Sequence, residues 1–306
     1  MFSRALRADL LMLITAAVWG FAFVAQRAGM EYVGPYTFNG VRFFLGGLSL
    51  LPFLFLRKPE ERRNAPSSTR FVYLLLYGLL AGFVLFLGSS FQQVGLVYTS
   101  AGNAGFITGL YVIIVPFLGL LWGRRPGSGV WLGALLAAAG LYLLNEAPGL
   151  GLNIGDALVL ACALFFALHV LLLGRISPRL PAVPLSIIQF FTCSLLSMLA
   201  AVWQETIILG DIIDAAVPIL YGGLGSVGIA YTLQVIAQKD APPAHAAIIL
   251  SLESVFALVG GVVLLNEAAG ALKILGAALM LTGMLAAQVQ RYYAHSIARR
   301  SAENSL

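Results

Sequence analysis

Charged side chains are scarce in this chain of 306 residues, of which they make up only 10%. A soluble domain usually has about 25% charged residues. Apolar residues make up 60% of the sequence, so the chain cannot cover a water-facing surface and is expected to be an integral membrane protein. The net charge of +5 does not indicate nucleic-acid binding, because the Lys and Arg residues lie in short connections and form no basic face.

The sequence also lacks the motifs of several function classes. Its two cysteines, Cys162 and Cys193, both lie inside apolar runs, which favours buried packing over a disulfide or a metal site. It has no glycine-rich phosphate loop, no spaced Cys/His set and no Asp-rich prenyl-diphosphate motif. We therefore expect no cofactor, no metal and no enzymatic activity, and an ATP-driven pump is disfavoured.

Long apolar runs dominate what is present. A membrane-spanning helix needs roughly 20 apolar residues, and the first run continues through Trp19 and Phe23 without a cleavage site, so we expect it to be retained. Ten runs of this kind occur, at about 9–27, 35–56, 71–92, 95–122, 128–145, 155–174, 183–203, 215–237, 243–265 and 270–290. The prediction is an all-α integral membrane protein with ten transmembrane helices.

The runs form two related sets of five. Residues 101–144 align without a gap along residues 244–287, so that Gly133 meets Gly276 and Gly140 meets Gly283. Other segments align as well, with the sequence Arg42-Phe43-Phe44 opposite Gln189-Phe190-Phe191. Because five is odd, the second half must enter the membrane in the opposite sense, which is typical of many secondary transporters. We predict one five-helix repeat at 1–145, an inverted one at 155–290, and a polar cytoplasmic tail at 291–306.

Lys and Arg residues indicate the orientation. With the N-terminus in the cytoplasm, nearly all of them fall on the cytoplasmic side, and only Arg27 and Lys273 fall on the other. The sequence thus predicts a multi-pass protein of a bacterial-type cell (inner) membrane, with both termini in the cytoplasm. Spacings of the form GxxxG, such as Gly78/Gly82, allow a homodimer without requiring one.

Glu253 is the sharpest candidate for a functional residue. It lies about eleven residues into an apolar run, roughly 16 Å deep at 1.5 Å per residue, near the middle of the membrane. A charge there is costly and usually faces a cavity or a partner. Two interpretations remain open: Glu253 binds a proton or a cationic group of a substrate, or its carboxyl group holds a neighbouring helix in place through a hydrogen bond.

Three further charged or titratable residues are candidates for ion pairs or structural roles. Arg42 could pair with a substrate carboxylate or with Glu253, or extend to the outer interface, and a structural role is favoured. His245, at the start of its run, is either a gate residue or an interfacial histidine. His169 could relay protons, although a packing role is favoured.

Polar and aromatic side chains recur inside several runs, where they need partners. Spread over several helices, such a set suits a water-filled cavity, although it could also join helices. The candidates for substrate or proton binding, besides Glu253, are Asn103, Tyr111, Gln234, Tyr231 and Trp19.

The sequence resembles the EamA-type branch of the drug/metabolite transporter superfamily. The resemblance rests on TAAVWGFAFVAQRAG, on Pro35 with the Arg42-Phe43-Phe44 segment, on YTSAGNAGFITGLYVIIVP and on LESVFALVGGVVLLNEAAGALKILGAALMLTGM, in this order and in two halves. It implies an inner-membrane carrier with a central cavity, lined mainly by the first four helices of each half. It also implies that small metabolites, often amino acids, are moved outward.

We therefore expect a secondary-active transporter that exports a small metabolite such as an amino acid by alternating access, with a proton as a possible coupling ion. The alternative within transport is efflux of lipophilic cations or drugs, for which Glu253, Trp19 and Phe23 would make an attractive lining. An alternative of another class, a membrane-embedded enzyme or a sensor, is disfavoured, because the chain has no clustered catalytic set and no long signalling tail.

Overall fold

The computed structural model describes residues 4–55, 68–99, 101–144, 153–265 and 270–303, and every regular element in these ranges is a helix. The helices are α1 (Arg4–Gly29), α2 (Pro35–Phe55), α4 (Ser68–Tyr98), α5 (Ala101–Gly109), α6 (Tyr111–Leu121), α7 (Ser128–Leu144), α8 (Ile154–Ile176), α9 (Ala182–Gln204), α10 (Leu209–Asp214), α11 (Ala216–Leu220), the π-helix η1 (Tyr221–Tyr231), α12 (Thr232–Ala237), α13 (Pro243–Leu250), α14 (Glu253–Leu265) and α15 (Ala271–Glu303).

Most of these helices match the apolar runs of the sequence. Within the described ranges, eight helical segments are long and apolar enough to cross a membrane, and two shorter apolar helices, Ser128–Leu143 and Pro243–Val259, coincide with the remaining two runs. The prediction of an all-helical membrane protein is confirmed. Helix α15 continues to Glu303, well past residue 290, where the apolar run ends.

The boundary between the third and fourth runs lies later than the sequence pattern placed it. Helix α4 continues to Tyr98, because the polar residues near position 92 find partners inside the bundle. The side-chain amide of Gln92 donates to Thr108 Oγ1 at 3.3 Å, and that of Gln93 donates to the carbonyl oxygen of Gln26 at 3.3 Å. Buried polar groups with partners do not need a loop.

The fourth and ninth runs are each interrupted near the middle. Between α5 and α6, the backbone N–H of Leu110 bonds to the carbonyl of Ile107, and between α13 and α14 that of Leu252 bonds to the carbonyl of Ile249. Each break is therefore a single turn in which a three-residue spacing replaces the four-residue spacing of the α-helix, a feature that often marks a hinge or a functional site. In the repeat alignment the two breaks lie within one residue of each other.

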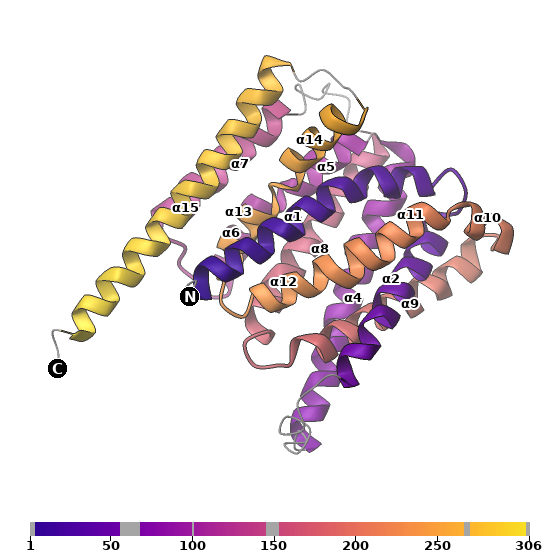
Figure 1. Cartoon of the computed structure of the whole chain (residues 1–306), viewed down its shortest axis with the longest axis horizontal. Coiled ribbons are helices and arrows are strands. Elements are labelled where there is room, and N and C mark those ends of the chain that lie inside the picture. Colours follow the sequence, from indigo (N-terminus) through magenta and orange to yellow (C-terminus); the bar gives the residue numbers. More distant parts are fainter. Residues whose placement is uncertain (1–3, 56–67, 100, 145–152, 266–269, 304–306) are drawn as a thin grey trace.

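Figure 1 shows α7 and α15 lying side by side along one flank of the bundle. Glycines allow their backbones to approach closely: a Cβ on Gly133 would lie 2.7 Å from the carbonyl oxygen of Gly283, and one on Gly140 would lie 2.5 Å from that of Gly276. Small residues are the usual means of close helix packing in a membrane. The largest buried apolar cluster connects this pair to α1, α6, α8 and α13.

Polar caps fix two helix starts at the same end of the bundle. The carboxylate of Glu205 accepts hydrogen bonds of 2.8 Å from the backbone N–H groups of Tyr36 and Thr37 in the first turn of α2. Helix α8 begins with a capping box, in which Asn153 and Asp156 bind each other's backbone N–H groups. These bonds satisfy donors that a helix start leaves open.

Candidate functional site

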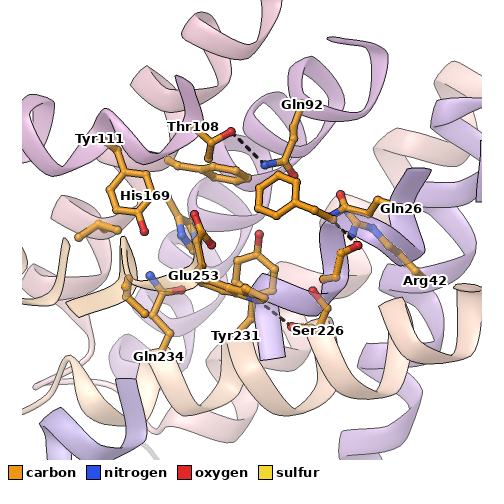
Figure 2. A pocket seen from close by; sticks show the side chains of 16 residues that line it. Gln26, Arg42, Gln92, Thr108, Tyr111, His169, Ser226, Tyr231, Gln234 and Glu253 are labelled. Atoms are coloured by element: carbon orange, nitrogen blue, oxygen red, sulfur yellow. Dashed lines mark hydrogen bonds between the residues drawn. The ribbon is translucent and has the colours of Figure 1, made fainter. Parts of the chain in front are cut away.

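A central cavity lies where the first helices of both halves meet the broken ones. It is lined by side chains from α1, α2, α4, α5, α6, α8, η1, α12, α13 and α14. Its volume is about 40 Å³, whereas pockets for small ligands usually measure about 300–1,000 Å³. The helices therefore enclose the site tightly in this conformation, and a ligand larger than a few water molecules requires them to separate. The polar lining residues labelled in Figure 2 are Gln26, Arg42, Gln92, Thr108, Tyr111, His169, Ser226, Tyr231, Gln234 and Glu253.

A polar side chain next to each of the two helix breaks lines this cavity. Glu253 is the first residue of α14, and Tyr111 is the first residue of α6. The N-terminus of a helix carries a partial positive charge, which favours a carboxylate there. Discontinuous helices that meet near the midplane are a common way to build a transport site.

Glu253 is held in place by close packing of α1. A Cβ on Gly20 would lie 2.6 Å from the carbonyl oxygen of Glu253 and 2.8 Å from the backbone nitrogen of Ala257. Only a glycine lets α1 approach the start of α14 this closely. The side chain of Glu253 is 4% exposed, so its carboxylate is fixed within the protein and not at its surface.

Gln26 Oε1 and three further polar oxygen atoms in the cavity have no hydrogen-bond partner among the described residues, the three being Glu253 Oε1, Gln234 Oε1 and Tyr111 Oη. Figure 2 shows these three residues on the same side of the cavity. Buried polar atoms without partners are rare and costly, so a group of them indicates a place where a ligand or water supplies the missing bonds. The chemistry that they favour is a donor, such as an ammonium group or a proton.

Arg42 lies on the other side of the cavity (Figure 2) and is 2% exposed. Its Nε donates to Asn39 Oδ1 at 2.9 Å, and its guanidinium carbon lies 5.4 Å and 5.1 Å from the ring centres of Phe38 and Phe43. No ion pair joins it to an acid in the part of the chain that the structure describes. The contacts with Asn39, Phe38 and Phe43 hold the guanidinium group in position, and its remaining N–H donors can bind an anionic group of a ligand.

Aromatic rings fill the space between the two charges. The rings of Trp19 and Tyr231 have their centres 4.6 Å apart, and Trp19 Nε1 donates to the carbonyl oxygen of Ser226 at 3.2 Å. His169 Nε2 lies 3.0 Å from Gln189 Oε1. Tyr231, whose ring lies beside those of Trp19 and His169, is the last residue of the π-helix η1. Segments of π-helix are frequent at functional sites.

Comparison with known proteins identifies the family. The model of the EamA-like transporter family matches this chain twice, over residues 6–146 and 153–287. An uncharacterized transporter of Archaeoglobus fulgidus is 34% identical over 92% of this chain and 86% of its own length. The chain belongs to the EamA-like transporter family. It is thus a multi-pass membrane transporter.

More distant relatives of this EamA-like transporter carry similar names. The uncharacterized transporter YwfM of Bacillus subtilis is 26% identical over 90% of this chain and 92% of its own length. The uncharacterized inner membrane transporter YedA of Escherichia coli is 28% identical over 47% of this chain and 45% of its own length. A solved crystal structure that is 20% identical superposes with a TM-score of 0.75 and covers 92% of this chain and 96% of its own, which shows that the fold is shared.

The cavity of the EamA-like transporter contains most of the candidate residues. The structure brings together Glu253, Trp19, Tyr111, Tyr231 and Gln234, and it adds Arg42 and His169, for which packing roles were favoured. The side chain of Asn103 lies outside the described residues. Sequence reasoning missed Gln26 and Ser226; the only available signal was that each is a polar residue within an apolar run.

His245 lies away from this cavity and pairs with a residue that the sequence did not single out. Its Nε2 is 3.1 Å from Asp9 Oδ1, which connects the start of α13 to α1. At the opposite end of the bundle, Thr99 Oγ1 donates to Asp156 Oδ1 at 2.6 Å, which connects the end of α4 to the start of α8. Both contacts are buried, and they lie at opposite ends of the bundle.

Proposed function

We propose that this EamA-like transporter is a secondary-active exporter of a small zwitterionic metabolite, most simply an amino acid, and that it works by alternating access. The observation that carries this proposal is the placement of Glu253 and Arg42 in one cavity without an ion pair between them. A buried charge is expensive unless a partner or a ligand neutralises it. One ligand with an ammonium and a carboxylate group would neutralise both charges at once.

The geometry indicates how such a ligand would bind. Its ammonium group would face Glu253, with Gln234 and Tyr111 supplying the oxygen atoms that have no partner among the described residues. Its carboxylate would face Arg42, whose fork of N–H donors suits a carboxylate. Its side chain would lie against Trp19 and Tyr231. His169 stays bound to Gln189 and acts as part of the wall.

Contacts between the halves support ten spanning helices arranged as two inverted repeats, 1–145 and 155–290. Phe43 and Phe190 are equivalent in the repeat alignment, and their ring centres lie 6.3 Å apart; those of the equivalent Phe44 and Phe191 lie 5.8 Å apart. Contacts of a residue with its own equivalent are expected across a two-fold axis.

The glycines of α7 and α15 follow the same rule. Gly133 is equivalent to Gly276, and Gly140 to Gly283. Gly133 contacts Gly283, and Gly140 contacts Gly276. Such a crossed pattern, in which i meets j′ and j meets i′, is what a pseudo-two-fold axis between the halves produces.

The proposal of alternating access is supported by the two end contacts, which the repeat relates to each other. Asp9 and Asp156 are aligned as the acids near the starts of the first helices of the two halves. Asp9 contacts His245 at the start of α13, and Asp156 accepts a hydrogen bond from Thr99 just before the start of α5. Opening one contact while the other stays closed would expose the cavity to one side at a time. We place the Asp9 end and both termini in the cytoplasm of a bacterial-type inner membrane, on the Lys/Arg bias.

Counterflow in proteoliposomes tests the proposal. Vesicles loaded with one unlabelled amino acid should take up the same labelled amino acid, and the Glu253→Gln variant should lose this uptake while keeping its elution profile and melting temperature. If the variant keeps exchange but no longer responds to an imposed pH gradient, Glu253 carries a coupling proton and not the substrate. Undiminished exchange that still responds to pH would refute a role of Glu253 in the site.

The second candidate function is efflux of lipophilic cations. The observation that favours it is the aromatic lining of the cavity by Trp19, Phe23, Phe166 and Tyr231 beside Glu253. A labelled lipophilic cation in the same counterflow assay separates the two functions. Uptake of the cation without uptake of any amino acid would favour this second function.

A further inference from the structure

A large cleft that borders both halves lies at the Asp9 end, away from the central cavity. It has a volume of about 480 Å³ and lies between α6 and α7 of one half and α13 and α15 of the other, with α8 at its back. We call it the arginine cleft. It is lined by Val115, Pro116, Gly119, Arg124, Arg125, Pro126, Gly127, Val130, Leu171, Pro242, Pro243, Ala244, His245 and Ala287.

The walls of the arginine cleft are apolar. Val115, Leu171 and Ala287 come from three different helices and present only hydrocarbon to it. Gly119 leaves further room, because a Cβ built on it would meet no atom closer than 3.8 Å. Apolar walls of this extent suit a hydrocarbon chain and do not suit a small hydrophilic anion.

The mouth of the cleft is positively charged. Arg124 and Arg125 line it, and the charge of Arg175 is close enough to act on Arg124. Burial lowers the pKa of the Arg124 guanidinium below its usual value, and the positive charge of Arg175 lowers it further. No ion pair joins any of these three arginines to an acid within the described ranges. Like charges held together in this way favour an anionic ligand.

The two arginines also lie just beyond the end of a spanning segment, Ala104–Leu121. They follow directly after Trp122, which is 54% exposed at the end of the spanning segment, and Trp131 packs near them against Phe117 with ring centres 4.9 Å apart. Tryptophan residues concentrate at the membrane–water interface. Basic pockets between transmembrane helices at this depth are suited to acidic lipid headgroups.

We propose that the arginine cleft binds one anionic phospholipid, with its phosphate at Arg124 and Arg125 and an acyl chain between α6, α7 and α13. The lipid would contact both halves of the transporter next to the His245–Asp9 pair. Neither the apolar walls nor the arginines alone would specify this ligand, because the walls would accept any lipid and the arginines would accept any phosphate. The two together select a lipid with a negatively charged headgroup.

Native mass spectrometry of the purified protein in detergent measures this binding directly. Phosphatidylglycerol should bind saturably with a stoichiometry of one, at least tenfold more tightly than phosphatidylcholine with the same acyl chains. The Arg124→Gln/Arg125→Gln double variant should bind phosphatidylglycerol roughly 25-fold more weakly, the effect of two basic residues next to an anionic lipid. Phosphatidylcholine binding should not change.

Matched variants separate the cleft from the general charge of this end. Arg4 and Arg7 lie at the same end but line a different hollow, so Arg4→Gln/Arg7→Gln removes equal charge and should leave phosphatidylglycerol binding intact. Gly119→Leu and Val130→Phe fill the cleft while keeping its arginines, and each should weaken the binding. Melting temperatures measured without added lipid show whether every variant is folded.

Four results would overturn the proposal. These are equal binding of the two phospholipids, equal loss in the two arginine pairs, binding that neither filling variant changes, and displacement of phosphatidylglycerol by glycerol 3-phosphate at a matching concentration. The last result would make the cleft a site for a soluble phosphate and not for a lipid.

Discussion

The broken helices α5–α6 and α13–α14 stand at corresponding places in the two halves, and they differ in one functional group. Leu110 separates the first pair, and the residue aligned with it is Glu253, which begins α14, the second helix of the other pair. A similar contrast separates α4, a continuous α-helix, from its counterpart, which contains the π-helix η1. The scaffold is repeated, whereas the polar groups are not, so the proposed binding site depends on positions at which the two halves differ.

Exchanging the groups at the two breaks tests this contrast most severely. Glu253→Leu should lower the rate of amino-acid counterflow about 100-fold, because a bond to a charged group is lost. Adding Leu110→Glu to that variant should restore nothing, since Leu110 packs beside apolar residues such as Phe23 and Ile107. Recovery of counterflow in the double variant would show that the two breaks are interchangeable, contrary to this expectation.

Arg42 and its repeat equivalent Gln189 provide the next comparison. Arg42→Gln should raise the half-saturating concentration of an amino acid about 10–100-fold, because the carboxylate loses its charged partner. Wild-type protein should prefer an amino acid over the corresponding amino-acid amide, and the variant should lose that preference. Gln189→Leu, which removes only the bond to His169, should keep the preference. If both variants discriminate as the wild type does, Arg42 is structural.

The glycine contacts of α7 and α15 test the relation between the halves through stability. Gly133→Ala and Gly283→Ala should each lower the free energy of unfolding by about 1–3 kcal/mol, because each Cβ would meet the carbonyl oxygen of the other glycine at 2.7 Å or 2.6 Å. Gly105→Ala is the control, because a Cβ there meets nothing within 4 Å. Thermal unfolding in detergent measures all three. Equal destabilisation by the control would refute the role of the close approach.

The end contacts should give the smallest effects, and these should have opposite directions. His245→Leu should favour opening at the Asp9 end, and Thr99→Val at the Asp156 end, each by roughly 2–10-fold, the effect of one hydrogen bond. An Ala22→Cys reporter in the cavity, labelled by an impermeant maleimide from either side of oriented vesicles, measures the shift. Changes in the same direction would contradict the assignment of the two contacts to opposite gates.

Much of the fold could be predicted from the sequence, because a spanning helix is a local property of composition. The runs that contain Glu253, Trp19 and Tyr231 each became helices, and the alignment of Phe43 with Phe190 anticipated a contact. The breaks at Leu110 and Ser251–Leu252 could not be foreseen in the same way. Gly109 directly precedes the first break, but neither a glycine nor a proline lies at the second, so the sequence held no signal that the two breaks share.

The candidate site was only partly predictable for a related reason. Intramembrane charge is conspicuous, so Glu253 and Arg42 could be singled out. Which face a helix turns toward the cavity is not determined by apolarity alone, so Gln26 and Ser226 gave no usable signal. The eleven-residue π-helix further changes the facing of Tyr231 relative to a regular helix.

The aromatic and glycine contacts between equivalent positions have a consequence for motion. When two inverted halves exchange conformations, a contact that lies on their symmetry axis is transformed into itself, whereas an off-axis contact is transformed into its partner. In the proposed alternating-access cycle, the Phe43–Phe190 contact and the α7–α15 glycine crossing would therefore persist throughout, while the Asp9 and Asp156 contacts would open one at a time. The two halves would then rotate about this axis, so probes attached along it would stay in place while the ends of the bundle move.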